Sequence, residues 1–418
     1  MKKRSGRRVV LTGLGPVTPV GVGRESFWKA ISAGQSGTRL LRELPHSFPV
    51  DSLRSRVMAD VNEEWLPSKE DQFDCGRQFR LGRLGFRLAL NDAGYEDLRS
   101  CHASVVLGSA VGGTMEMEAS FLQMDQGTHL DLSRRPADLM RQMSFHTMAH
   151  ELAAASACDG PVLTISTGCT AGLDAIATGF DLIRSGEVDV ALTGSAEAPL
   201  TPVVFAAFDV LGALTKRNFD PEHASRPFDR DRDGFVLAEG AAFILLEERS
   251  HALERGAYIY AELSGFASVS NSYHMTDLPA DGAALAECIR LAMDDAGISA
   301  EDVDHINAHG SSTKQNDLCE TNAIKTALGA RAQRITVNSL KSMVGHALGA
   351  SNAIEIAGCA LSLANQHLFP TTNLDLPDEE CDLDYVPNKS RAANLRNLIK
   401  LSSGFSGIHS AAVMSVAG

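Results

Sequence analysis

The segments LALNDAGYEDLRSCHASVVLGSAVGG, residues 88–113, and LAMDDAGISAEDVDHINAHGSST, residues 291–313, follow one pattern. Each contains the end of a helix, a glycine that stops the helix, an acidic loop, an apolar strand and a turn of small residues. A pattern that recurs so far along the chain predicts an internal duplication. We therefore expect two equivalent halves, residues 1–255 and residues 256–418.

Short apolar runs alternate with segments of helical period throughout the chain, and this alternation predicts an α/β fold. The helical segments include GRLGFRLALNDAG (82–94) and GAALAECIRLAMDDAG (282–297). The predicted strands are RRVVLTGLG (7–15), ASVVLGSAVGG (103–113), GPVLTISTG (160–168), VDVALTGSAE (188–197), AAFILLEE (241–248), DHINAHGSS (304–312) and ITVNSL (335–340). Residues 39–67 and 120–150 break the pattern, and we expect them to be insertions that cap a site or a partner surface.

Composition narrows the class of protein. The 418 residues carry a net charge of −14, which argues against nucleic-acid binding. No apolar run is long enough to cross a bilayer or to act as a signal peptide, so we expect a cytoplasmic protein. The eight cysteines form no CxxC pair and no zinc-like spacing, so no metal site is predicted. Arg77, Arg80, Arg83 and Arg87 form either a basic patch for an acidic partner or a solvated helix face.

Cys169 follows the apolar run PVLTI and begins a helical segment, within STGCTAG (166–172). Unpaired backbone N–H groups and the positive end of the helix dipole at this place favour a thiolate. Gly168 and Gly172 beside it leave room for a substrate. Taken alone, the position also suits a buried structural cysteine.

Two histidines strengthen the catalytic interpretation, because His309 and His346 each follow a predicted strand in a glycine-rich turn. Equivalent halves would bring these turns to face Cys169. One cysteine and two histidines suit carbon–carbon bond formation: the thiolate takes an acyl group, and two imidazole N–H donors stabilise a developing enolate. Lys341 adds positive charge and Glu320 is its expected partner, although a surface salt bridge would explain both.

Several blocks of the sequence resemble the β-ketoacyl synthases of the thiolase fold, and more narrowly the ketosynthase α subunit of bacterial type II polyketide synthases. The general blocks are STGCTAGLDA (166–175), ASRPFDRDRDGFVLAEGAA (224–242), NAHGSSTKQNDLCET (307–321), KSMVGHALGA (341–350) and SGFSGIHSA (403–411). The narrower resemblance extends to TPVVFAAFDVLGALTKRN (201–218), NSYHMT (271–276) and DEECDLDYVPN (378–388). Together these blocks span nearly the whole chain.

The resemblance implies a duplicated, five-layered αβαβα fold and a decarboxylative Claisen condensation that extends a poly-β-ketone chain. It implies that Cys169 is the nucleophile, that His309 and His346 bind the malonyl thioester carbonyl, and that Lys341 and Glu320 tune this cluster. The resemblance assigns the remaining site positions as follows: Ser311 and Thr313 to the phosphopantetheine arm of an acyl carrier protein, Phe405 to the gate, and the N–H groups of Phe405 and Cys169 to the oxyanion hole.

The resemblance also implies partners: an acyl carrier protein, malonyl and growing polyketide thioesters, and a chain-length factor that completes a heterodimer. No cofactor is expected on the chain itself, because phosphopantetheine comes with the carrier protein. Two positions depart from the family, since Ser312 and Ser406 stand where glycines are usual. Serine has less backbone freedom than glycine, which puts the conformation of both loops in doubt.

Four alternatives remain open at this point. An elongating ketosynthase of fatty acid synthesis would be a homodimer with the same three catalytic residues. A thiolase would usually carry a second cysteine where this chain has His346. A scaffold subunit would be expected to lack Cys169, and a cysteine hydrolase would release free acid from a thioester.

Overall fold

The computed structural model of the chain describes residues 6–45, 48–67, 76–125, 140–141 and 143–418. It is built on one long mixed sheet whose principal strands run in the order β6-β5-β7-β9-β1-β10-β16-β15-β11-β12. The strands of the first half are β1 (Val9–Thr18), β5 (Ala103–Gly108), β6 (Val162–Ile165), β7 (Val190–Glu197) and β9 (Gly240–Glu248). Those of the second half are β10 (Ala261–Ser270), β11 (His305–Asn307), β12 (Thr336–Asn338), β15 (Asn397–Ser403) and β16 (Ile408–Ser415).

The two series of five strands have the same spatial order, which from the outer edge inward is third, second, fourth, fifth, first. In each series the second strand pairs in parallel with the third and fourth, and the remaining pairs are antiparallel. The series meet where β1 pairs with β10, with Val9 opposite Leu263. The predicted duplication is confirmed. The division at residue 255, which falls between α8 (Arg249–Glu254) and β10, stays a prediction.

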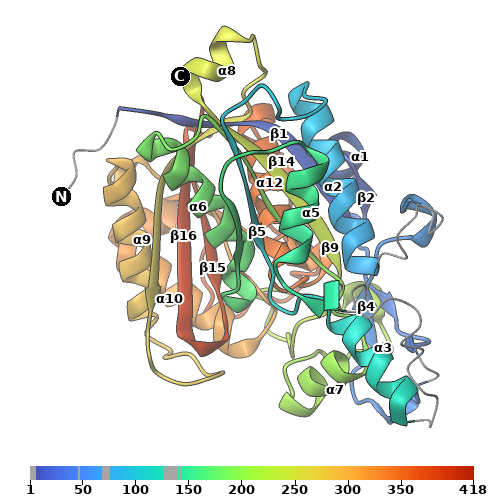
Figure 1. Cartoon of the computed structure of the whole chain (residues 1–418). Helices are drawn as coiled ribbons and strands as arrows, with labels where there is room; N and C mark the ends of the chain where they lie inside the picture. The colour runs from blue at the N-terminus through green and yellow to red at the C-terminus, as the bar shows by residue number, and fades with distance from the viewer. Residues whose placement is uncertain (1–5, 46–47, 68–75, 126–139, 142) are drawn as a thin grey trace.

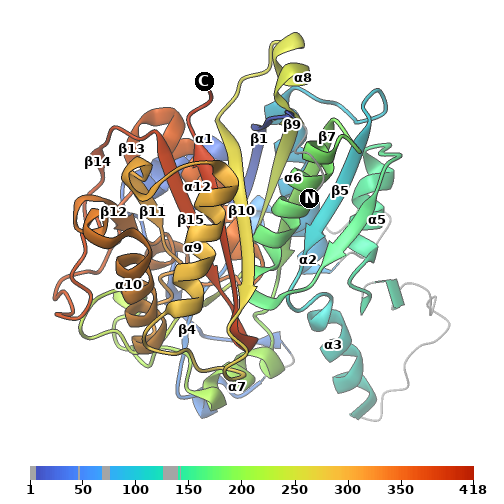
Figure 2. The same ribbon diagram turned by 90° about the vertical axis from the view of Figure 1, so that its left-hand side faces the viewer.

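Helices cover and separate the two halves of the sheet, which gives five layers (Figure 1). One outer layer consists of α2 (Arg77–Ala93) and α5 (Thr147–Ala155), the middle layer of α6 (Ala171–Ser185) and α12 (Ala350–Asn365), and the other outer layer of α9 (Ala283–Ala296) and α10 (Lys314–Leu328). Figure 2 shows α9 and α10 on the opposite side from α5. Three large buried apolar clusters correspond to the three helix layers.

The glycines that the repeated pattern places after its helices end them in the structure. Gly94 ends α2 with a φ of 79°, and Gly297 ends α9 with a φ of 71°. In each case the backbone N–H of the glycine bonds to carbonyls of the last turn, a closure that needs the left-handed conformation. The same local chemistry therefore ends the same helix in both halves.

The insertion at residues 39–67 contributes a cap beside the site. Its strands β3 (Arg39–Leu40) and β4 (Val57–Ala59) form a small sheet with β8 (Leu237–Ala238). Leu237 in turn forms a bridge with His346. The insertion at 120–150 lies largely outside the described residues; at its flanks are α3 (Thr114–Asp125) and α5. Further elements are β2 (Gly21–Val22), α1 (Arg24–Ser32), α7 (Pro202–Leu211), α11 (Lys341–Val344), β13 (His367–Leu368) and β14 (Arg391–Ala392).

In the part of the chain that the structure describes, no helix combines the length and the apolar character that a membrane span requires. Over the same described ranges, no three His, Cys, Asp or Glu side chains are grouped in a way that could hold a metal ion.

Candidate active site

A cavity of about 360 Å³ joins residues from both halves of the molecule. Cys169 of the first half lines it together with His309 and His346 of the second. The two imidazole rings lie 5.1 Å apart, centroid to centroid, and approach edge to face. The prediction that the three turns meet is confirmed.

Cys169 lies in a 3-10 turn, Gly168–Thr170, that connects β6 to α6. A close approach of two helices holds this turn in place, because the N–H of Gly172 donates to the carbonyl of Gly349 over 3.1 Å. A Cβ at position 172 would lie 2.5 Å from that carbonyl oxygen, so only glycine fits there. The first turns of α6 and α12, the equivalent helices, are therefore in contact beside Cys169.

The prediction that the helix terminus makes Cys169 a thiolate is wrong for the resting structure. The thiol opens onto the cavity, but desolvation by the surrounding protein raises its pKa to about 11. The backbone N–H groups of Phe405 and Cys169, which face the sulfur, and the charge of Lys341 all oppose this rise without overcoming it. The helix dipole is screened and short in range, whereas desolvation acts on the whole charge. The resting residue is a neutral thiol.

Both histidines are neutral as well. Burial lowers their pKa values well below the usual range, and the nearby charge of Lys341 lowers them further. His346 pairs through Nδ1 with the Ser351 hydroxyl at 2.9 Å and packs against the ring of Phe235. Nδ1 of each ring is buried, so each ring can present only Nε2 to the cavity.

The predicted pairing of Lys341 with Glu320 is wrong, and both side chains are buried, which excludes a surface salt bridge. Glu320 instead accepts the backbone N–H groups of His309 and Gly310, at 2.6 and 2.8 Å. Its burial raises its pKa to about 7. Lys341 donates to the His309 carbonyl over 2.8 Å and pairs with Glu355 at 2.5 Å. Both residues thus hold the His309 turn, but from opposite sides.

Glu355 and Lys400 are site residues that the sequence reasoning missed. Lys400 lies on β15 and pairs with the second carboxylate oxygen of Glu355 at 2.8 Å. A signal was present, since Glu355 is the only charged residue in the apolar helix ASNAIEIAGCALSLAN (350–365). Lys400 is likewise the only charged residue of its strand, NLIKLSS (397–403). A lone charge in a buried element needs a partner.

The mouth of the cavity contains the other predicted residues. Ser311 and Thr313 line it, and their hydroxyls lie 3.0 Å apart. Thr313 also begins α10 by accepting the N–H of Asn316. Phe405 is 37% exposed and its ring packs on Phe208, which also lines the cavity.

Ser312 and Ser406 both adopt the left-handed conformation, with φ of 69° and 68°. At both positions, therefore, a serine takes a backbone conformation that favours glycine, the residue usual in the family. Ser312 gains a partial compensation, because its hydroxyl accepts the N–H of Arg226 at 3.0 Å.

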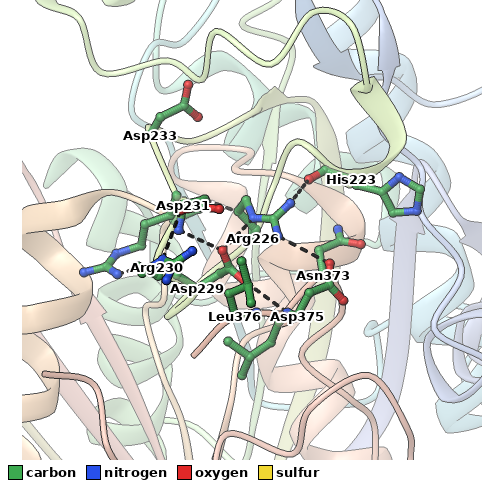
Figure 3. A network of polar contacts seen from close by, with 12 residues as sticks. His223, Arg226, Asp229, Arg230, Asp231, Asp233, Asn373, Asp375 and Leu376 are labelled. Atoms are coloured by element: carbon green, nitrogen blue, oxygen red, sulfur yellow. Dashed lines mark hydrogen bonds and ion pairs between the residues drawn. The ribbon is translucent and has the colours of Figure 1, made fainter. Parts of the chain in front are cut away.

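Arginines and aspartates of the segment 224–235 form a network of polar contacts (Figure 3), and the end of this segment, residues 233–235, lines the cavity. Asp229 accepts Arg226 Nε at 2.9 Å and the N–H groups of Asp375 and Leu376. Arg232, 2% exposed, donates to the carbonyls of Thr313 and Lys314 and pairs with Asp378. The network therefore fixes the start of α10, where the hydroxyls at the mouth lie.

Two arginines of α2, Arg77 and Arg80, are paired with carboxylates. Arg77 donates to the buried carboxylate of Glu239, and Arg80 donates to Glu63 at 2.6 Å. These two cations connect α2 to the cap, so neither the solvated-face interpretation nor the docking interpretation applies to them.

Comparison with known proteins gives the family. The Beta-ketoacyl synthase N-terminal domain matches residues 6–252, and the Beta-ketoacyl synthase C-terminal domain matches residues 260–375. The putative polyketide beta-ketoacyl synthase 1 of Streptomyces cyaneus is 43% identical, with 98% of each chain covered. The tetracenomycin polyketide synthase ketoacyl synthase alpha subunit of Streptomyces glaucescens is 41% identical, with 99% of this chain and 98% of the relative covered. The 3-oxoacyl-[acyl-carrier-protein] synthase 2 of a Synechocystis strain is 38% identical, with 96% of each covered.

Solved structures agree. A complex described as a type II PKS acyl-carrier protein with its ketosynthase bound to the hexaketide matches with a TM-score of 0.91 and 42% identity, covering 99% of this chain and 100% of that chain. The ishigamide ketosynthase/chain length factor matches with a TM-score of 0.88 and 32% identity over the same shares. The chain therefore has the thiolase fold and belongs to the β-ketoacyl synthases, condensing acyltransferases, as a ketosynthase α subunit of the type II polyketide synthase kind.

Proposed function

We propose that Cys169 takes the growing acyl chain from a carrier protein, and that His309 and His346 promote the decarboxylation of a malonyl-carrier protein that then attacks it. The observation that carries this assignment is the convergence of one thiol and two neutral imidazoles, from both halves, on a single cavity. A hydrolase would need a positioned base for water, and burial, which lowers the pKa values of both imidazoles, makes them weaker bases.

Acyl transfer is an exchange of one thiol for another. The Cys169 sulfur forms a bond to the acyl carbon, the bond to the carrier thiol breaks, and the proton of Cys169 passes to the departing sulfur. Because the thiolate is the nucleophile, the Cys169 sulfur gives up its proton as it attacks, and the exchange as a whole creates no net charge. The N–H groups of Cys169 and Phe405 face the reacting sulfur and form the oxyanion hole for the tetrahedral intermediate.

Decarboxylation follows in the same cavity. The carbon–carbon bond to the malonyl carboxylate breaks, carbon dioxide leaves, and the electron pair forms an enolate whose oxygen accepts from Nε2–H of His309 and His346. The enolate carbon then attacks the acyl carbon, and Cys169 leaves as a thiolate that takes up one proton. The role of Lys341 and Glu320 is to hold the His309 turn from both sides.

The hydroxyls of Ser311 and Thr313 bind the amide groups of the phosphopantetheine arm that the carrier protein brings. Support comes from their position at the mouth of the cavity, next to Thr276 and Gln315, where polar groups can pair with an extended polar chain. The chain itself binds no cofactor in this scheme.

The partner subunit is a chain-length factor that binds at β6, forming a heterodimer. Among the described residues, strand β6 is paired on one side only, and Val162 and Leu163 are each 38% exposed. An apolar edge strand of this kind favours addition of a strand from a second subunit. We assign the reaction to the cytoplasm. The seven cysteines among the described residues are free, and a reducing compartment keeps cysteines in this state.

The test is to incubate the purified chain, alone and with a co-expressed chain-length factor, with acyl-loaded carrier protein, then map adducts by peptide mass. We expect the acyl increment on Cys169. Chain extension that needs the partner supports the heterodimer, whereas extension by the chain alone supports a homodimer. Release of free acid without a new carbon–carbon bond would overturn the proposal.

A further inference from the structure

A second buried lysine lies behind the histidines. The Lys400 side chain is fully buried, and its ammonium donates to the carbonyls of Ala308, at 3.2 Å, and Leu401. It also pairs with Glu355 at 2.8 Å. An ammonium buried this deeply costs several kcal/mol of desolvation, so its surroundings need to compensate it.

Glu355 divides its two oxygens between two lysines. One oxygen pairs with Lys341, whose ammonium donates to the carbonyl of His309. The other pairs with Lys400, whose ammonium donates to the carbonyl of Ala308. Consecutive carbonyls of one turn are therefore held by two cations that share a single carboxylate.

The backbone N–H and carbonyl groups of the turn around His309 are thus held by hydrogen bonds. Its N–H groups at 309 and 310 donate to Glu320, and the carbonyl of Gly310 accepts from the Ser339 hydroxyl at 2.7 Å. Nδ1 of the His309 ring, by contrast, has no hydrogen-bond partner among the described residues. The orientation of this imidazole therefore depends on the backbone that carries it.

We propose that Lys400 is a positioning residue for His309: by holding the Ala308 carbonyl and Glu355, its ammonium fixes the turn that presents the imidazole to the malonyl thioester. This inference rests on the proposed function, since it concerns the decarboxylation step.

Loss of Lys400 should not leave a buried charge without a partner. Without Lys400, Glu355 keeps its pair with Lys341, so no carboxylate is left buried and unpaired. The fold is therefore expected to tolerate the loss, and the effect should concentrate on the turn at Ala308. Cys169 lies in the other half and is not held by Lys400.

A change of charge at Lys400 also affects titration of His309. Several titratable or charged groups surround His309. Four are cationic or imidazole groups: Lys341 on α11, His346 before α12, Lys400 on β15 and His409 on β16. Two are carboxylates: Glu320 on α10 and, through the two lysines, Glu355 on α12. Since the positive charge of Lys400 lowers the pKa of His309, its removal raises that pKa.

Two variants separate charge from hydrogen bonding: Lys400→Met removes both, and Lys400→Gln keeps a donor for the Ala308 carbonyl. The matched control is Ser402→Ala, on the same strand, whose buried hydroxyl has no hydrogen-bond partner among the described residues. With the co-expressed partner present, the measurements are acyl loading of Cys169 and carbon dioxide release from malonyl-carrier protein across pH.

We expect loading within about threefold of the unmodified protein in both variants, and decarboxylation about 10- to 100-fold slower in Lys400→Met, with a smaller loss in Lys400→Gln. The acidic limb of the decarboxylation profile should move to higher pH in both, whereas Ser402→Ala should match the unmodified protein.

Equal losses of loading and decarboxylation, or no loading in either variant, would make Lys400 a residue of fold stability and overturn the proposal. Unchanged decarboxylation in Lys400→Met would overturn it too. If the unmodified protein itself releases no carbon dioxide, the failure lies with the proposed function instead.

Discussion

The two halves of the molecule repeat one arrangement of strands and helices but differ in what their loops carry. After the third strand, the first half has Cys169 and the second half has His346. After the second strand, the first half has Ser109 and the second half has His309. The duplication thus supplies the geometry that brings two helix termini together, and the divergence of the loops supplies a thiol on one side and two imidazoles on the other.

The buried charged residues next to these loops also differ between the two halves. The second half buries Lys341, Glu355 and Lys400 behind its histidines, whereas the first half has Glu197 at the end of β7. Burial raises the pKa of Glu197 to about 8, and its charge, when present, raises the pKa of Cys169. Glu197 therefore adds to the desolvation that is the main cause of the raised pKa of Cys169.

The outer edges differ too. Strand β12 of the second half is largely buried and bridged by Asp384, but β6 of the first half is open. Among the described residues, the more open edge of the sheet therefore belongs to the first half.

Removal of the nucleophile should have the largest effect. Cys169→Ala is expected to lower condensation by at least about a thousandfold, because it removes the thiol that lines the cavity and takes the acyl chain. The measurement is product formation from acyl- and malonyl-carrier protein. Cys158→Ser, which replaces a half-buried thiol far from the cavity, should leave the rate unchanged. Full condensation by Cys169→Ala would contradict the division of roles between the halves.

Removal of either histidine should be the next largest effect. His309→Ala and His346→Ala are each expected to slow decarboxylation about 100- to 1000-fold, the usual loss for one oxyanion donor. Acyl loading of Cys169 should remain. His367→Ala, a change well away from the cavity, serves as the control. A parallel loss of loading would mean that the second half also activates the thiol.

The neutral thiol predicts the pH dependence of alkylation. Because the pKa of Cys169 is raised to about 11, the thiolate fraction should increase about tenfold for each pH unit between 7 and 10. The rate of alkylation of Cys169 by iodoacetamide, followed by peptide mass, should rise in proportion. A plateau of the alkylation rate below pH 8 would show that Cys169 is a thiolate at neutral pH, as its place at the helix terminus suggests.

The open edge predicts a smaller effect on assembly. Leu163→Lys places a charge on β6 and is expected to weaken binding of the chain-length factor about tenfold or more, which is about 1.4 kcal/mol. Titration followed by light scattering measures it. Leu253→Lys, an exposed apolar position on α8, is the matched control. Equal binding by both variants would place the partner elsewhere.

The two left-handed serines predict the smallest effect. Ser406→Gly should raise the free energy of unfolding by up to about 1 kcal/mol, because glycine accepts this conformation without strain. Ser312→Gly should gain less, since it loses the bond from the Arg226 N–H. Urea denaturation compares them, and a larger gain at position 312 would show that the hydroxyl contributes nothing there.

All seven predicted strands form, because apolar runs between glycine-rich turns are a local signal. Strands β10, β15 and β16 were not predicted: β10 is rich in small and polar residues, β15 contains a buried lysine and β16 contains His409. The three residues that meet in the cavity, Cys169, His309 and His346, were predictable, since each follows a strand. The partner of Lys341 was not, because the choice between Glu320 and Glu355 depends on which helix approaches α11 in space.

The central claim is that the two halves divide one carbon–carbon bond formation between them. A single turnover tests it most directly: Cys169 is loaded with a labelled acyl group in the presence of the partner, freed of excess donor, and mixed with malonyl-carrier protein. We predict one carbon dioxide and one β-ketoacyl-carrier protein for each acyl group lost, with Cys169 returned as a free thiol. Carbon dioxide and free acid without the β-ketoacyl product would contradict the account.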